Sequence, residues 1–221
     1  MIRGGDTVMP GSSRTGLAVG TGVLAVLVGS VAAMTGLWNS DVNLRNGAIP
    51  WAFGALAVGI GLILLGSYRC GIGRPARLVR WGSSLALVGL GVAAAFLFGT
   101  GILAVLDSGL LSTGDTLLSR LGTLAASVCT LLILPVGLLA LSVAVLVDEE
   151  LSRAARSLPL IGTLVFMAGP VLVGLLPDSQ ERTVLLMWTV LLGAVWAGHG
   201  LLVMAKLGRH RTFLQPQTPA G

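Results

Sequence analysis

Hydrophobic residues in this chain gather into six long runs, and short stretches rich in polar residues, glycine and proline separate the runs. The runs cover residues 17–37, 51–68, 82–106, 122–147, 159–176 and 184–206. Each run approaches or exceeds the length of about 20 residues that an α-helix needs to cross the hydrocarbon core of a bilayer. The pattern therefore predicts an all-α membrane protein, a bundle of six transmembrane helices within residues 16–209.

The two ends of the chain differ from the apolar runs. Residues 1–15 and 210–221 are polar and contain glycine, serine or proline, so we expect a flexible tail at each end of the bundle. With the N-terminus inside, only Arg45, Arg120 and Arg182 of the 14 basic residues lie outside, which leaves eleven on the inner side. This excess predicts a multi-pass protein of the cell (plasma) membrane with both termini in the cytoplasm.

Composition strengthens the membrane interpretation and removes one alternative. Only 10% of the residues are charged, whereas about 25% is usual in soluble domains. The net charge of +5 does not indicate a nucleic-acid partner, because the basic residues lie at helix ends and are not interleaved with aromatic residues. The two cysteines, Cys70 and Cys129, form no CxxC pair, and we expect no disulfide between them.

A faint internal repeat relates the first two runs to the last two. The segment GALAVGIGLILL at 54–65 matches GAVWAGHGLLVM at 193–204 through Gly, Ala and Leu positions at one constant offset. With that offset increased by one, the matched residues of the first and fifth runs are Gly22 with Gly162, Gly29 with Gly169 and Val31 with Val171. We predict that hairpin 1–2 and hairpin 5–6 are parallel copies flanking hairpin 3–4. The alternative is chance matching between apolar sequences of similar composition.

Small residues recur at helical spacing on two of the runs. Gly91, Ala95 and Gly99 follow one another at intervals of four residues, and so do Gly193 and Ala197. Such residues let helix backbones approach closely within a membrane. We expect these Gly and Ala faces to pack inside the bundle, on another membrane protein, or on a second copy of this chain.

His199 lies well inside an apolar run, where no Asp, Glu or Arg is found. It precedes Lys206 by seven residues, or about 10 Å at a helical rise of about 1.5 Å per residue. A neutral imidazole needs both a donor and an acceptor partner in an apolar medium, and Thr21, Ser142 and Thr163 lie at similar depth. We expect His199 to be buried and neutral at pH 7 against the first, fourth or fifth run. Its role is either a hydrogen bond between helices or a proton or ligand site.

Two prolines fall near the middle of apolar runs. Pro135 and Pro170 each remove one backbone hydrogen bond, which frees the carbonyl groups of Leu131 and Phe166. Together with the nearby hydroxyl of Thr130, such groups could contribute to a solute site or a hinge. The alternative is a kink that only serves helix packing.

The stretch RCGIGRPARLVR concentrates four arginines, Arg69, Arg74, Arg77 and Arg80, without an acidic residue. Arginines at a membrane surface attract anionic lipid headgroups, so these four residues are candidate lipid contacts. Their simplest role is to fix the orientation of the chain in the membrane.

The six runs carry no Asp, Glu or Arg deep inside, although proton relays and cation pathways usually require such residues. We find no carboxylate pair, no HExxH motif and no nucleophile beside a base, so we expect no catalysis, cofactor or metal. The predicted function is a non-catalytic scaffold or an accessory subunit of a membrane complex. The alternative is a small transporter or channel for a neutral or apolar solute, with a pathway near Pro135, Pro170 and His199.

Overall fold

The computed structural model describes residues 12–38, 42–73, 75–106, 124–149, 151–175 and 178–213. These residues are helical apart from short turns, and no strand occurs among them. Within the described residues, six helical segments are long and apolar enough to cross a membrane, which confirms the prediction of an all-α fold with six long apolar helices. These segments are Arg14–Trp38, Ala48–Arg69, Ala76–Thr100, Leu124–Leu146, Arg153–Leu172 and Arg182–Gly208.

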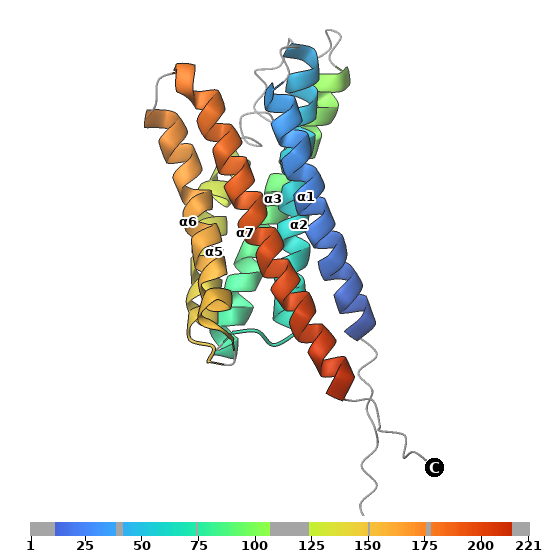
Figure 1. Ribbon diagram of the computed structural model, residues 1–221. Helices are drawn as coiled ribbons and strands as arrows, with labels where there is room; N and C mark the ends of the chain where they lie inside the picture. The colour runs from blue at the N-terminus through green and yellow to red at the C-terminus, as the bar shows by residue number, and fades with distance from the viewer. Residues whose placement is uncertain are drawn as a thin grey trace, which may run out of the picture.

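Most of the helices are longer than the apolar runs that predict them (Figure 1). The elements are α1 (Ser12–Trp38), α2 (Val42–Arg69), α3 (Ala76–Leu106), the π-helical turn η1 (Cys129–Ile133), α5 (Leu134–Leu146), α6 (Arg153–Leu175) and α7 (Asp178–Phe213). Hydropathy marks the apolar part of each helix, whereas the backbone hydrogen bonds continue into flanking polar residues. The structure describes only residues 12–15 and 210–213 of the two predicted tails, so 1–11 and 214–221 lie outside the described residues. The predicted lipid contact Arg74 lies outside them as well.

The helices form a closed ring in chain order. Each of α1, α2, α3, α5 and α6 packs on the next helix along the chain, and α7 returns to pack on α1. Among the described helices only α2 and α7 also touch across the ring. The contact between α1 and α7 extends from Ser30 beside Gly193 to Gly20 beside Met204.

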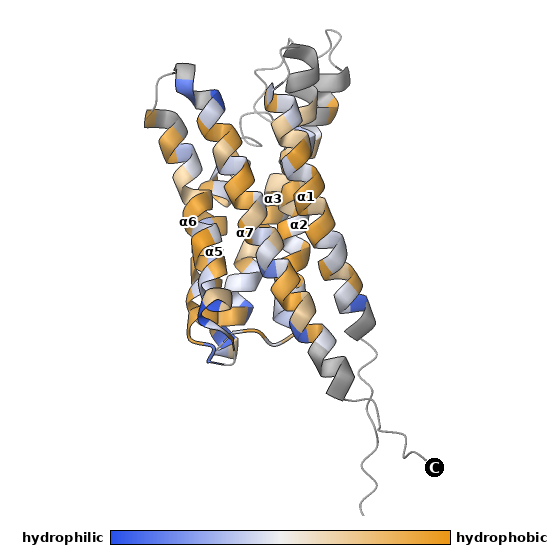
Figure 2. Cartoon of the chain, in the orientation of Figure 1, coloured by the Kyte–Doolittle hydropathy of each residue, from blue (hydrophilic) through white to orange (hydrophobic). Residues whose placement is uncertain are grey.

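The interior of the ring is filled by large apolar side chains. Trp196 is the largest fully buried side chain, and it packs in one core with Ile63, Leu64, Leu138 and Leu192. Hydrophobic residues occur along most of the length of each helix, as the colouring in Figure 2 shows, and many of them are exposed on the outward faces. Exposed large residues on these faces include Leu17, Leu24, Leu131, Leu132, Leu164, Val171, Met187 and Leu201.

Glycines bring neighbouring helices close together at several points of the ring. A Cβ at Gly22 of α1 would lie 2.8 Å from the carbonyl oxygen of Gly59 on α2, so the two backbones touch there. In hairpin α6–α7, Gly162 instead faces the ring of Trp196, and Gly169 faces the ring of Trp188. The glycines that the repeat pairs thus face the second helix of their own hairpin in both cases, although the repeat itself stays a prediction.

Pro135 is buried where the fourth span changes its helical geometry. The turn η1 immediately precedes it, and the backbone N–H of Leu134 donates to the carbonyl oxygen of Cys129, five residues earlier. A π-helical turn widens the helix and shifts its hydrogen-bond register by one residue. The chain therefore adapts to the missing proline donor through a local π-helix, a response that the sequence prediction of a free Leu131 carbonyl did not include.

Candidate functional site

His199 lies where α2 and α7 meet across the ring. Its side chain is 3% exposed, and its Nε2 atom lies 3.1 Å from the hydroxyl oxygen of Ser67 on α2. The Ser67 hydroxyl also donates to the carbonyl oxygen of Ile63 at 2.9 Å. The burial agrees with the sequence prediction, but the partner is a serine of the second span rather than a residue of the first, fourth or fifth.

The single hydroxyl proton of Ser67 can go either to the Ile63 carbonyl or to Nε2 of His199, so these two contacts fit both neutral tautomers of the imidazole. In both tautomers Nδ1 is buried and has no partner among the described residues. The His199 ring also meets the ring of Trp196 edge-on, with centroids 6.0 Å apart.

Ser142 and Thr163, predicted as partners of His199, instead bind each other. Their hydroxyl oxygens lie 3.0 Å apart between α5 and α6, and both side chains are fully buried. Each hydroxyl also reaches a carbonyl oxygen one turn earlier in its own helix, at Leu138 and Pro159. The contact is a hydrogen bond between the side chains of two adjacent helices. Thr21 is exposed on α1 and does not join either pair.

The remaining predicted pathway residues do not converge on His199. Pro135 is buried in the fourth span, Thr130 is half-buried in the preceding π-helical turn, and Pro170 is exposed on α6. Near Pro170, the indole N–H of Trp188 on α7 donates to the carbonyl oxygen of Val165 at 2.6 Å. The sequence predicts a free carbonyl at Phe166. In the structure, the carbonyl that accepts the indole N–H is that of the adjacent residue, Val165.

The chemistry available at these buried sites is limited. The hydroxyl of Ser83 and the indole nitrogen of Trp196 are buried without a partner, as is Nδ1 of His199. Among the described residues, no group of three or more His, Cys, Asp and Glu side chains is placed to hold a metal ion. The buried polar groups described here are single hydrogen-bond donors or acceptors, of the kind that pair helices within a membrane.

A second candidate site lies where the spans end at the basic side of the bundle. The loop between α2 and α3 turns through Gly71 and Gly73, whose φ angles of 64° and 101° favour glycine. The backbone N–H of Gly73 donates to a carboxylate oxygen of Asp148 at 2.8 Å, and Asp148 is buried. This bond fastens the α2–α3 loop to the segment that follows α5.

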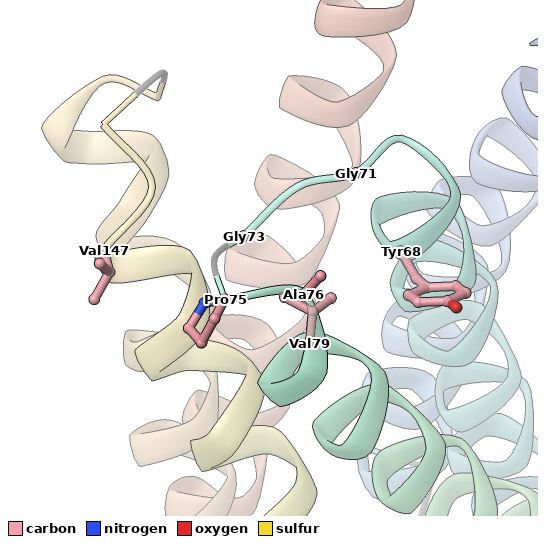
Figure 3. A pocket seen from close by; sticks show the side chains of 7 residues that line it. All are labelled: Tyr68, Gly71, Gly73, Pro75, Ala76, Val79 and Val147. Carbon is pink, nitrogen blue, oxygen red and sulfur yellow. The ribbon is translucent and has the colours of Figure 1, made fainter.

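A hollow of about 650 Å³ opens beside this junction (Figure 3). Its walls come from the end of α2, the following loop, the start of α3 and the residue after α5. The lining residues are Tyr68, Gly71, Gly73, Pro75, Ala76, Val79 and Val147. Apart from the Tyr68 hydroxyl, the side chains that line the hollow are apolar.

Basic side chains surround the same end of the bundle. The predicted lipid contacts Arg69, Arg77 and Arg80 are exposed on α2 and α3. Cys70 is half-buried beside them, and burial raises the pKa of its thiol while nearby Lys206 partly offsets that rise. Both Cys70 and Cys129 are free, as the sequence predicts.

Comparison with known proteins adds no relative to this description. No protein-family model matches the chain, and no curated protein or solved structure matches it either.

Proposed function

We propose that the chain is a non-catalytic multi-pass membrane protein that serves as a scaffold or an accessory subunit of a membrane complex. The exposed apolar residues on the outward helix faces support the membrane part of this proposal. A helix that is hydrophobic all round belongs in a protein interior or in lipid, and these faces have no protein cover within the described residues. Lipid therefore solvates the outside of the ring.

The proposed orientation places the basic end of the bundle in the cytoplasm of a plasma membrane. Arg69, Arg77, Arg80 and Arg153 are exposed at that end, whereas Arg182 stacks over the Trp38 ring at the opposite end. An excess of basic residues on one side favours the cytoplasmic side.

The observation that carries the subunit proposal is the outward face of α3. Gly91 and Ala95 are exposed and Gly99 is half-exposed, and a Cβ at either glycine would meet no atom within 4 Å. Large exposed residues such as Val88 and Phe96 flank these small residues on α3, whereas the outward faces of α1, α6 and α7 carry mainly large residues. A shallow face of small residues is the surface on which another transmembrane helix packs closely.

The filled interior also favours a subunit over a conduit. Trp196, Leu192 and Leu138 fill the ring at mid-depth, each with no more than 2% of its surface exposed. The two buried polar pairs, His199 with Ser67 and Ser142 with Thr163, lie at separate helix contacts. Within the described residues, the predicted pathway groups therefore do not line one common cavity.

The test is to extract the protein at native abundance in lipid nanodiscs and identify by mass spectrometry what accompanies it. We expect a stoichiometric membrane partner, or a second copy of the chain. Ala95→Leu fills the small-residue face and should reduce the recovered partner at least tenfold. The matched control is Ala194→Leu on the exposed face of α7, which should leave the recovery unchanged. Recovery of the chain alone, as a monomer, contradicts the subunit proposal.

The second candidate function is a small transporter or channel for a neutral or apolar solute. It draws support from the unpartnered buried nitrogen of His199 and from the π-helical turn before Pro135. Uptake of neutral solutes into vesicles that contain the purified protein tests it directly. Flux above that of empty vesicles, reduced by His199→Phe, favours this candidate, and equal flux in both kinds of vesicle excludes it.

A further inference from the structure

The hollow at the basic end of the bundle lies at the level where the apolar spans stop. Tyr68 is the residue before the end of the second span at Arg69, Ala76 begins the third, and Val147 follows the end of the fourth at Leu146. In a bilayer, this level corresponds to the boundary between lipid acyl chains and headgroups. A molecule that occupies the hollow therefore meets both an apolar and an aqueous environment.

Three exposed arginines are next in sequence to residues that line the hollow. Arg69 follows Tyr68, Arg77 follows Ala76 and Arg80 follows Val79. Asp148 is buried and accepts a hydrogen bond from the Gly73 backbone. Among the described acidic residues beside the hollow, Glu149 is the exposed one. These described charged residues, called the rim below, carry more positive than negative charge at this end of the bundle, while the wall is apolar.

We propose that this hollow binds one anionic phospholipid. The apolar wall at Val79 and Val147 contacts the upper part of an acyl chain, and Arg77 and Arg80 bind the phosphate. Guanidinium groups bind phosphate oxygens through paired, charge-assisted hydrogen bonds. The inference rests on the proposed membrane embedding, and it is independent of whether the α3 face binds a partner.

Charge complementarity favours an anionic lipid over a zwitterionic one. The choline group of phosphatidylcholine would bring a positive charge close to the arginines and cancel part of the attraction. Phosphatidylglycerol keeps its net negative charge, and each basic residue near an anionic lipid contributes a favourable electrostatic interaction. The hollow should therefore select phosphatidylglycerol from a mixture in which phosphatidylcholine is in excess.

Native mass spectrometry of the full-length protein, released from nanodiscs of phosphatidylcholine with a minor fraction of phosphatidylglycerol, measures this selection. Arg77→Gln, Arg80→Gln and the double variant remove rim charge. Arg14→Gln and Arg153→Gln are the charge-matched controls, because both residues are exposed on helices that do not line the hollow. Ala76→Trp fills the hollow without changing the charge.

We expect one retained phosphatidylglycerol on the unmodified protein, about fivefold weaker binding for each rim arginine removed and about 30-fold weaker binding for both. Ala76→Trp should also lose this lipid, and the two controls should keep it. Equal losses in the rim and control variants, or equal retention of the two lipids, overturn the inference and leave the membrane proposal intact. A chain that does not enter the bilayer at all overturns both.

Discussion

In hairpin α1–α2 the glycines of one helix meet the backbone of the other, whereas in hairpin α6–α7 they meet tryptophan rings. A Cβ at Gly59 would lie 2.7 Å from the carbonyl oxygen of Gly22, while a Cβ at Gly162 would lie 3.0 Å from the Trp196 ring. A backbone contact between two helices yields only if a whole helix moves. A side chain can turn or be replaced, so the second arrangement tolerates change better.

The two arrangements also differ in what they require of polar groups. The close approach of α1 and α2 through glycine adds no side-chain donor to the interior. The rings between α6 and α7 add indole N–H groups, of which Trp188 donates to Val165 and Trp196 has no partner. Filling a wide helix contact with tryptophan therefore introduces polar atoms that the glycine contact avoids.

The largest effect is expected from removing the ring that fills the second hairpin. Trp196→Ala should lower the free energy of unfolding by about 3–5 kcal/mol, because it opens a cavity in the centre of the ring of helices. Reversible unfolding in mixed detergent micelles measures the change. Trp81→Ala is the control, since the Trp81 side chain is 69% exposed and its loss should matter far less. Equal effects of the two substitutions would contradict the central role of Trp196.

Gly22→Ala tests the backbone contact of the first hairpin and should cost about 1–3 kcal/mol. The added methyl would meet the Gly59 carbonyl oxygen at 2.8 Å, so α1 and α2 must separate. The control is Gly91→Ala on the open face of α3, where no atom lies within 4 Å and the change should stay within about 0.5 kcal/mol. Similar unfolding curves for the two variants would show that the helices separate easily.

Gly162→Ala should cost about 1 kcal/mol, less than Gly22→Ala, because the Trp196 ring can shift. The comparison becomes sharper in a Trp196→Leu background, which removes the ring atoms nearest to Gly162. There Gly162→Ala should cost almost nothing, and a double-mutant cycle gives the coupling between the two positions. Strict additivity would indicate that the glycine and the ring do not restrict each other.

The smallest effect is expected for Trp188→Phe, at about 0.6 kcal/mol, which is typical of a hydrogen bond between membrane helices. The substitution removes the donor to the Val165 carbonyl but keeps an aromatic ring near Phe53. Trp51→Phe on α2 is the control, because phenylalanine preserves an aromatic contact with Phe98. If Trp51→Phe costs as much as Trp188→Phe, the hydrogen bond contributes nothing measurable.

The sequence predicts the helices well and their neighbours poorly. Apolar runs locate all six spans because length and hydropathy are properties of single segments. Which helices touch is decided by side-chain shape across the whole bundle, so the contact of α2 with α7 is not visible in any one run. The partner of His199 depends on that contact. Ser67 stands beside Tyr68 and Arg69, where a serine is indistinguishable from an ordinary interfacial residue.

Local adjustments of the backbone are equally hard to predict from the sequence. A proline in a run predicts a missing hydrogen bond, but the sequence does not say how the chain responds. At Pro135 the response is a π-helical turn, whereas near Pro170 the Val165 carbonyl accepts an indole N–H from another helix. The Asp148 bond to Gly73 joins two loops far apart in sequence, and no spacing rule connects them.

The closure of the ring by its first and last spans has a consequence for biogenesis. Because α7 packs on both α1 and α6, the bundle is complete only after the final span has left the ribosome. Until then, α1 exposes the side with Ser30 and Val23 that later receives Gly193 and Gly200 of α7.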